Sequence, residues 1–396
     1  MPVLSSLIIS DNKIEKINRG AFKNLPSLKF LNLVNNTINV VDGVFVDLPL
    51  LDSLRLDSNN IHELQAGCFD ALENLTVLGL GDNKIDKLPS DLFQKLSRLE
   101  DLVLAGNMLT SLNCTIFAGL PELSSLHLDG NQIGNSIQEE CFKHLNKLSV
   151  LSLYSTGIKM LKPAVFSGLK QLEALILGRN NIEKLEAKSF IMLPNLVSLN
   201  LKDSSINTIE ANAFGGLNKL LHLYLSRNNL KQWTVDAFKG LNALERLFLD
   251  GNRIETITAG QLYHLKALNV LDLRNNTIKH IPNKFFGSLA NLEVLFLGYN
   301  KISAIEPKSF YGLKNLSRID LSNNSLETVD SDTFAGLPNI SHIWLDNNKI
   351  TKMSFIDFIN MSRLFYVGLH GNKLPPSVTE PFGMKFNYKI IDPFLD

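Results

Sequence analysis

The chain repeats one arrangement of apolar and polar positions almost from end to end, L-x-x-L-x-L-x-x-N-x-I/L. The first position of each copy usually follows the previous one by 24 residues, as Leu123 follows Leu99. Sixteen copies occur, with first positions at Leu4, Leu28, Leu51, Leu75, Leu99, Leu123, Leu148, Leu172, Leu196, Leu220, Leu244, Leu268, Leu292, Leu316, Ile340 and Leu364. The L-x-L alternation has the period of a β-strand, so the leucines share one face and the residues between them share the other. We therefore predict about sixteen short strands with a leucine core.

A column of asparagines follows each predicted strand. Its members are Asn12, Asn36, Asn59, Asn83, Asn107, Asn131, Asn180, Asn228, Asn252, Asn276, Asn300, Asn324, Asn348 and Asn372, with Thr156 and Ser204 in two repeats. An asparagine side chain offers two donors and an acceptor, which can satisfy the backbone groups freed where the chain turns away from a strand. We interpret this column as a structural ladder.

A column of phenylalanines follows in nearly every repeat. It consists of Phe22, Phe45, Phe69, Phe93, Phe117, Phe142, Phe166, Phe190, Phe214, Phe238, Phe286, Phe310, Phe334 and Phe358, with Leu262 as the exception. An aromatic row at a repeat spacing is typical of a core spine, so we expect these rings to stack along the wall opposite the strands.

These columns predict an α/β leucine-rich-repeat solenoid, or horseshoe, with a concave parallel sheet of about 16 strands and irregular convex turns. No linker or low-complexity segment interrupts the repeats. We expect residues 1–374 to form a single domain and residues 375–396 to form a tail or partial cap, with a last irregular strand at 386–391.

The repeat unit resembles a known class. The segment LSRIDLSNNSLETVDSDTFAGLPN, residues 316–339, is similar to the "typical" extracellular leucine-rich repeats of animals. That class occurs in Toll-like receptor ectodomains, in chaoptin-, connectin- and Slit-type adhesion proteins, and in the acid-labile subunit. The resemblance covers almost the whole chain and implies a shared scaffold with different ligands. The cysteine-rich flanking caps common in that class are absent from this sequence.

Composition and charge exclude several classes of function. Lys and Arg number 39 and Asp and Glu also number 39, so no net charge attracts the chain to nucleic acid or to an anionic membrane. The sequence contains no run of about 18 apolar residues, so no segment is predicted to insert into a membrane. The first repeat starts at the first residues, with no signal peptide in this chain, so we expect either an excerpt of a longer protein or an open-ended array that needs a further segment.

The three cysteines leave two alternatives open. Cys68 and Cys141 lie three repeats apart, about 15 Å at the usual strand spacing, so they cannot bond. Cys114 and Cys141 lie in adjacent repeats at near-equivalent positions and could bond. We favour three buried thiols, with the 114–141 disulfide as the alternative.

Glycosylation sequons favour an extracellular protein, either secreted or at the cell surface. The motif N-x-S/T occurs at Asn35, Asn74, Asn113, Asn275, Asn315, Asn323, Asn339 and Asn360. None of these asparagines is a ladder position. Asn35, Asn275 and Asn323 directly precede the ladder, where a side chain can face solvent.

No catalytic motif is present, so we predict that the protein is not an enzyme and needs no cofactor. The chain lacks G-x-S-x-G, Walker, H-E-x-x-H and C-x-x-C patterns. His127, Asp129 and Asp101 lie on neighbouring predicted strands and could surround a cation. We interpret them as a solvated cluster, and we predict no metal site.

The exposed columns of the concave sheet carry the functional signal. Aromatic and charged residues gather on these columns in the C-terminal half, whereas the N-terminal half has one aromatic residue, Phe30, among acidic residues. Rigid aromatics and arginines are typical of binding hot spots. We predict Tyr224, Phe248, Phe296 and Trp344 as anchors, Arg246, Arg318, Asp272 and Asp320 as orienting residues, and His222, His342 and Tyr366 as further contacts.

The predicted binding surface can be tested in the structure, and it implies a function. Trp344 and Phe296 should be substantially exposed while Leu345 and Leu297 are buried. The predicted function is non-enzymatic recognition of a protein ligand or receptor, as a receptor ectodomain, adhesion or matrix module, and homo- or heterodimer formation is left open. The alternative is an intracellular scaffold or enzyme inhibitor.

Overall fold

The computed structural model describes residues 3–329, 333–353, 358 and 361–375. The chain divides into two compact units. Unit 1 comprises Met1–Leu225 with Lys239–Leu241, and unit 2 comprises Ser226–Phe238 with Asn242–Asp396. The predicted strand at 386–391 lies outside the described residues, and a single domain over residues 1–374 stays a prediction.

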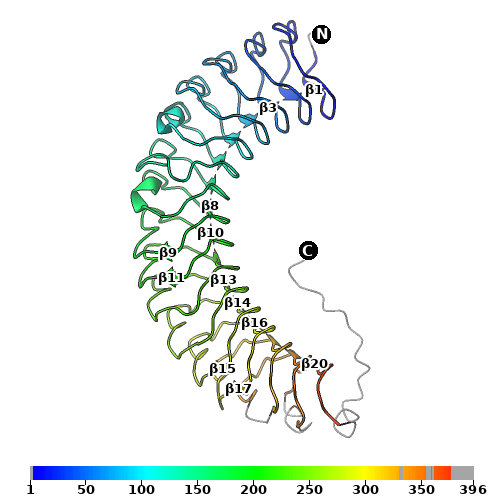
Figure 1. The fold of residues 1–396 in the computed structure, drawn as a ribbon, viewed down its shortest axis with the longest axis vertical. Coiled ribbons are helices and arrows are strands. Elements are labelled where there is room, and N and C mark those ends of the chain that lie inside the picture. The colour runs from blue at the N-terminus through cyan, green and yellow to red at the C-terminus, as the bar shows by residue number, and fades with distance from the viewer. Residues whose placement is uncertain (1–2, 330–332, 354–357, 359–360, 376–396) are drawn as a thin grey trace. The chain divides into compact units, whose positions relative to one another are not determined.

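The sheet of unit 1 consists of short parallel strands, one for each repeat, along the inner edge of the coil (Figure 1). These strands are β1 (Ser6–Ile8), β2 (Phe30–Asn32), β3 (Ser53–Arg55), β4 (Val77–Gly79), β5 (Asp101–Val103), β6 (Ser125–His127), β7 (Val150–Ser152), β8 (Ala174–Ile176), β10 (Ser198–Asn200) and β12 (His222–Tyr224). Equivalent positions pair across neighbouring strands, as Leu7 pairs with Leu31. The repeat spacing therefore sets the register.

The outer side of unit 1 is mostly irregular. Its described part contains two short 3₁₀ helices, η1 (Cys114–Gly119) and η2 (Pro163–Phe166), and a small parallel pair of β9 (Lys184–Leu185) with β11 (Thr208–Ile209). Helix η1 begins where the side chain of Asn113 accepts a hydrogen bond from the amide of Thr115, which is ordinary N-capping.

Unit 2 repeats the same design. Its inner strands are β13 (Arg246–Phe248), β14 (Val270–Asp272), β16 (Val294–Phe296), β18 (Arg318–Asp320), β19 (His342–Trp344) and β20 (Tyr366–Gly368). On its outer side β15 (His280–Ile281) pairs with β17 (Ala304–Ile305). The two units together hold sixteen inner strands in the described residues, as the repeat count predicts.

The core confirms both apolar columns. The leucine-type residue in the middle of a strand is fully buried, as Leu199 and Ile343 show. Spine rings stack within each unit, with centroids 6.0 Å apart for Phe190 and Phe214. Where Leu262 interrupts the spine, the neighbouring repeats supply extra buried rings, Trp233 and Phe285, that the repeat pattern does not predict. These rings enlarge the apolar core of the repeats on either side of Leu262, where Trp233 packs on Phe238 and Phe285 packs on Phe286.

The asparagine ladder is also confirmed. Asn131 accepts a hydrogen bond from the amide of Leu109 at 3.0 Å and donates to the carbonyls of Leu104 and Leu128 at 3.0 and 2.9 Å. One side chain thus ties two successive repeats and satisfies backbone groups that no strand partner reaches.

Thr156 forms a different set of bonds. Its hydroxyl donates to the carbonyl of Leu153 at 2.9 Å, within its own repeat. The amide of Gly134 in the preceding repeat donates to the backbone carbonyl of Thr156 at 2.8 Å. A backbone bond therefore replaces part of the side-chain ladder at this position.

The residue before the ladder position adopts a left-handed conformation in every repeat. Its φ is 55° at Asn35, 52° at Asn275 and 56° at Tyr299. Asparagine, aspartate and glycine tolerate this conformation best. The local fold therefore supplies its own reason for asparagine at Asn35, Asn275 and Asn323, and their position alone is weaker support for glycosylation than the sequence suggested.

Cys114 and Cys141 form a disulfide, with Cα atoms 4.8 Å apart. The interpretation that we favoured, three buried thiols, is therefore wrong, and the alternative holds. The two cysteines occupy the turns of adjacent repeats, where the repeat spacing brings Cα atoms within bonding range. Cys68 remains a free thiol and is buried, and its burial raises its pKa to about 12.

Candidate binding surface of the inner sheet

The register of unit 2 aligns the predicted binding columns side by side. Arg318 of β18 pairs with His342 of β19, which pairs with Tyr366 of β20. One step along the strands, Asp320 pairs with Trp344. Alternating residues of a strand share a face, so these side chains lie on the sheet surface opposite the leucines.

Four rings form a cluster at this surface. The ring of His342 lies 5.6 Å from Trp344, 5.7 Å from Phe365 and 6.0 Å from Tyr366, and Trp344 lies 5.7 Å from Tyr366. Phe365 is 76% exposed, and the other three are half-buried. We call these four residues the aromatic cluster. The sequence prediction included three of them and missed Phe365, which directly precedes β20 outside the two alternating columns.

Carboxylates border the aromatic cluster. Asp346 accepts a hydrogen bond from the amide of His370 at 2.9 Å, and Asp320 accepts one from the amide of Ser322 at 2.8 Å. Burial raises the pKa of both carboxyls, and the charge of Asp346 raises that of Asp320 further. Gly368 leaves room for Asp346, because a β-carbon at position 368 would lie 2.1 Å from its Oδ2.

His342 carries no positive charge into this cluster at neutral pH. Burial lowers its pKa below the ordinary histidine value, and the nearby charge of Arg318 lowers it further. Arg318 itself is exposed. The aromatic cluster therefore joins neutral rings to anionic groups at the ends of the strands.

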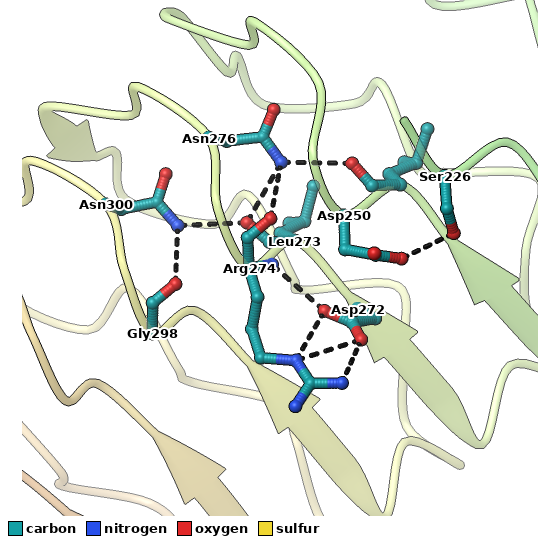
Figure 2. A network of polar contacts seen from close by, with 9 residues as sticks. Ser226, Asp250, Asp272, Leu273, Arg274, Asn276, Gly298 and Asn300 are labelled. Carbon is teal, nitrogen blue, oxygen red and sulfur yellow. Dashed lines mark hydrogen bonds and ion pairs between the residues drawn. The ribbon is translucent and has the colours of Figure 1, made fainter. Parts of the chain in front are cut away.

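Two repeats earlier, an arginine covers the ring at the equivalent position, Phe296. The guanidinium of Arg274 lies 4.5 Å from the centroid of Phe296. It also binds both carboxylate oxygens of Asp272, with Nη2 to Oδ2 at 2.6 Å and Nε to Oδ1 at 3.1 Å. Figure 2 shows the contact between Arg274 and Asp272, with the ladder bonds of Asn276 and Asn300 to the carbonyl of Leu273 beside it.

This arrangement corrects two sequence predictions. Phe296 is only 7% exposed, because Arg274 lies over its ring and Val270 and Val294 pack in the same buried cluster. Asp272 is 1% exposed and binds Arg274, so its carboxylate is not presented for orienting a partner. The predicted exposure of Phe296 is wrong. The predicted burial of Leu297 and Leu345 is confirmed, and Trp344 is half-buried.

Comparison with known proteins identifies the repeat family. A family model described as Leucine rich repeat matches residues 2–61, 49–109, 73–133, 135–182, 170–230, 225–278, 266–326 and 314–374. The chain belongs to the leucine-rich-repeat family. No curated protein matches the chain as a whole.

Solved structures share the leucine-rich-repeat fold. A leucine-rich-repeat protein of Leptospira interrogans is 26% identical with a TM-score of 0.80, over 95% of this chain and 92% of that one. A chain of the Drosophila Toll–Spatzle complex is 22% identical with a TM-score of 0.81, over 94% of this chain and 55% of that one. A chain from the octameric complex of Latrophilin 3, Unc5D and FLRT2 is 25% identical with a TM-score of 0.59, over 77% of this chain and 87% of that one.

The remaining predicted contacts fall in two places. Within unit 2, Arg246 is exposed and Phe248 is half-buried on β13, in register with Val270 and Asp272. His222 and Tyr224 are half-buried on β12 of unit 1. All four residues of the aromatic cluster belong to unit 2.

Several acidic residues on the inner face of unit 1 serve the fold. Asp57 binds Arg55 at 2.9 Å and accepts a bond from the amide of Gly81 in the next repeat at 3.0 Å. Asp129 accepts a bond from the amide of Tyr154 at 3.0 Å in the same way. These carboxylates connect the ends of adjacent strands, so their presence needs no partner to explain it.

His127 and Asp129 lie 3.8 Å apart, and the carboxylate of Asp129 raises the pKa of His127. Over the described residues, no group of three or more His, Cys, Asp or Glu side chains is arranged to hold a metal ion. Across the same part of the chain, no helix has the length and apolar character needed to cross a membrane.

The sequon asparagines occupy three kinds of position. Asn35 and Asn275 are exposed and Asn323 is half-buried before the ladder, and Asn113 is exposed at the start of η1. Asn74, Asn315 and Asn339 share a column just before the first leucine of a repeat; Asn74 and Asn339 each donate to a carbonyl of the preceding repeat at 2.8 Å, and Asn315 is exposed. Asn360 lies outside the described residues.

Proposed function

We propose that this chain is an extracellular recognition module of the "typical" animal class of leucine-rich repeats, and that it binds a protein partner on the inner face of unit 2. It would act within a receptor ectodomain, an adhesion protein or a matrix protein. The observation that carries the proposal is the aromatic cluster of His342, Trp344, Phe365 and Tyr366 on an ordered sheet.

The sheet orders the aromatic cluster before any partner binds. A soluble protein that presents Phe365 at 76% exposure beside three half-buried rings carries a patch that water does not favour. A partner that covers it gains apolar contact, and the strands already fix the backbone, so little conformational entropy is lost on binding. Aromatic and arginine side chains at such places dominate binding energies. Leucine-rich-repeat proteins are in general interaction modules and not enzymes.

Two features support an extracellular location. The Cys114–Cys141 disulfide belongs to an oxidising compartment. The second is Thr37, whose hydroxyl oxygen is buried with no hydrogen-bond partner in the described residues. Folding alone gives no reason for a hydroxyl there, whereas the sequon of Asn35 requires one at this position.

Two of the similar structures are complexes with protein partners, Toll with Spatzle and FLRT2 with Latrophilin 3 and Unc5D. The likeness to Toll is a likeness of fold. The identity of the partner proposed here therefore rests on the surface chemistry of this chain.

The test uses the full chain, secreted behind a supplied signal peptide and presented to an array of cell-surface and secreted proteins. We expect a partner whose affinity falls at least tenfold with Trp344→Ala and changes less than twofold with Lys308→Ala, on the convex side. The reverse order of effects would place the binding surface on the convex side. A chain that is secreted and folded with every sequon unmodified would remove the argument from Thr37.

A further inference from the structure

We propose that the ring of Trp344 and the carboxylates beside it form a site for a cationic side chain of the protein partner, preferably an arginine. This inference rests on the proposed function and names the chemistry that the partner presents. Its basis is a comparison of two equivalent places on the inner face of unit 2.

The first place is occupied by the protein's own arginine. Asp272 of β14 and Phe296 of β16 are register partners, and Arg274 follows two residues after Asp272. Its guanidinium lies 4.5 Å from the centroid of Phe296 and binds Asp272 at 2.6 Å. Carboxylate, guanidinium and ring form one layered contact, in which a cation meets a ring face and a carboxylate together.

The second place repeats these parts two repeats later but lacks the arginine. Asp320 of β18 and Trp344 of β19 are register partners, as Asp272 and Phe296 are. The amide two residues after each aspartate donates to its Oδ1, at 2.9 Å from Arg274 and 2.8 Å from Ser322. Ser322 therefore stands where Arg274 stands in the first place. A serine is too short to cover a ring on the next strand, and Trp344 remains half-buried where Phe296 is buried.

A second carboxylate strengthens the anionic character of the second place. Asp346 follows Trp344 on its own strand, and its Oδ2 lies above Gly368, the register partner of Trp344 on β20. Trp344 thus lies between the strand that carries Asp320 and the position that Asp346 covers. Burial raises the pKa of both carboxyls, and at Asp320 the charge of Arg274 offsets this rise only in part.

One nearby arginine is already engaged: the charge of Arg274 acts to lower the pKa of Asp320, but its guanidinium binds Asp272. Arg318 lies in the other column, in register with His342, and is exposed. The pKa of His342 is lowered by burial and by Arg318, so its ring is neutral at pH 7. The amide of His370 donates to Asp346, and the His370 side chain is exposed.

Arginine fits the site better than lysine. The planar guanidinium can stack on the indole while its nitrogens pair with a carboxylate, as Arg274 does on Phe296 and Asp272. A lysine ammonium meets the same ring as a point charge and cannot form the forked pair. We call the surface formed by Asp320, Ser322, Trp344 and Asp346 the arginine site.

The direct test measures a small probe by nuclear magnetic resonance. The chain has two tryptophans, so a protein labelled with ¹⁵N in the indole gives two signals, which Trp344→Phe assigns. We expect acetyl-Gly-Arg-Gly-amide to shift the Trp344 signal saturably, in the millimolar range, and to leave that of buried Trp233 in place. The citrulline peptide, which is neutral and of equal shape, should bind about tenfold more weakly. Equal binding of the two peptides overturns the inference.

The internal comparison supplies the variant. Ser322→Arg should place the chain's own guanidinium over Trp344, shift the Trp344 signal without any peptide, and abolish the response to the arginine peptide. Ser322→Gln, neutral and long, is the matched control and should keep the response. If Ser322→Arg does not fold, Asp320→Asn replaces it and should weaken the arginine peptide several-fold without changing the citrulline peptide. Retention of the arginine response in the folded variant overturns the inference.

The two proposals fail separately. A partner that loses affinity with Trp344→Ala but keeps it with Ser322→Arg would uphold recognition on this face and overturn the arginine site. A partner that is insensitive to Trp344→Ala overturns the proposed binding surface, whatever the peptides do. Loss of partner affinity by at least tenfold with both variants, and less than twofold with Ser322→Gln, supports both.

Discussion

At the scale of single residues, the ladder shows how one side chain determines local stability. Asn180 accepts hydrogen bonds from the amides of both Thr156 and Ile158, at 3.1 and 2.9 Å. The amides of Thr156 and Ile158 are therefore held by the next repeat. The effect of threonine at position 156 falls on the preceding repeat. In other repeats the side chain at the ladder position accepts a bond from an amide of the repeat before it, as Asn131 does from Leu109. Thr156 has no amide oxygen to accept in this way from Ile133. A threonine is shorter than an asparagine, so its place in the column alone would predict a weak point at residues 156–158, and the bonds of the structure shift it to Ile133 of the preceding repeat.

The first prediction follows from this shift. Thr156→Asn should restore an acceptor for the amide of Ile133 and slow its hydrogen exchange several-fold, a gain of about 1 kcal/mol in local stability. Thr156→Val is the control. It removes the hydroxyl bond to Leu153 and supplies no acceptor, so hydrogen exchange at Ile133 should not slow and should become faster. Unchanged or faster exchange at Ile133 in Thr156→Asn would show that the backbone bond from Gly134 already completes the ladder.

The second prediction concerns Thr37. Thr37→Val removes a buried hydroxyl without a hydrogen-bond partner, so thermal stability should stay equal or rise slightly, while the secreted protein loses one glycan. Thr277→Val is the matched control, since Thr277 completes the sequon of Asn275 and donates to the carbonyl of Ile254 at 3.1 Å. That variant should also lose a glycan but should cost about 1 kcal/mol. Intact-mass analysis measures the loss of the glycan and thermal melting measures the change in stability. If the mass changes in neither variant, glycosylation at Asn35 and Asn275 is contradicted.

At the scale of elements, the disulfide joins the η1 turn to the turn of the following repeat. Its cysteines are 27 residues apart in sequence. In the chain-entropy model a loop of this length stabilises the linked repeats by about 3.5 kcal/mol. In a solenoid each repeat contacts mainly its neighbours, so the effect should be local.

The third prediction combines reactivity with local stability. Without reductant, an alkylating reagent should modify no cysteine in the native protein, because Cys68 is buried and its raised pKa keeps it a thiol. Denaturant should expose one cysteine, and denaturant with reductant all three. The double variant Cys114→Ala/Cys141→Ala should speed hydrogen exchange in η1 while leaving unit 2 unchanged. Modification of three cysteines in denaturant alone would contradict the bond.

The repeat pattern predicts the elements far better than it predicts the binding surface. The strands, ladder and spine follow from columns whose members all meet the same environment, so a consensus residue is enough. Phe296 and Trp344 occupy one column yet differ in exposure. The residue that follows the preceding strand is Arg274 beside Phe296, whose ring it covers, and Ser322 beside Trp344, whose ring it is too short to cover. Exposure on the concave face depends on a side chain in another repeat, which a single column does not show. Phe365 was missed for a related reason, since it lies just outside the strand.

The fourth prediction uses the carboxylates at the strand ends. Burial raises the pKa values of Asp320 and Asp346, so both protonate at a higher pH than ordinary carboxyls as the solution is acidified. The arginine peptide should therefore bind fully at neutral pH and weaken as the pH falls through those raised values. His342, whose pKa lies below the ordinary histidine value, gains positive charge on the same descent and acts in the same direction. The Trp344 indole signal measures the affinity at each pH; affinity that is constant down to pH 4 contradicts a role for these carboxylates.

At the scale of the whole molecule, the structure separates stability from recognition. Except in the terminal repeats, the leucine core, the ladder and the spine are buried in both units, whereas the aromatic cluster and Arg246 lie outside that core. In a repeat protein, stability is close to a sum of repeat and neighbour terms. Residues of the inner face can therefore differ between repeats with little effect on folding, and this freedom suits a recognition scaffold.

The fifth prediction tests that separation on the partner complex. Trp344→Ala and Phe248→Ala remove rings that the sheet has already ordered, so each should cost on the order of 2 kcal/mol in affinity, mainly through faster dissociation. Thermal stability should change little, because both rings are only half-buried on the inner face and outside the leucine core. Asp82→Ala, at an exposed acidic position of unit 1, is the control. Any effect of that variant should fall on the association rate and fade with added salt. Surface plasmon resonance at two salt concentrations separates the rates. Losses confined to Lys184→Ala or Lys308→Ala, on the outer side, would show that the solenoid binds through its convex surface and that its inner aromatic cluster serves another role.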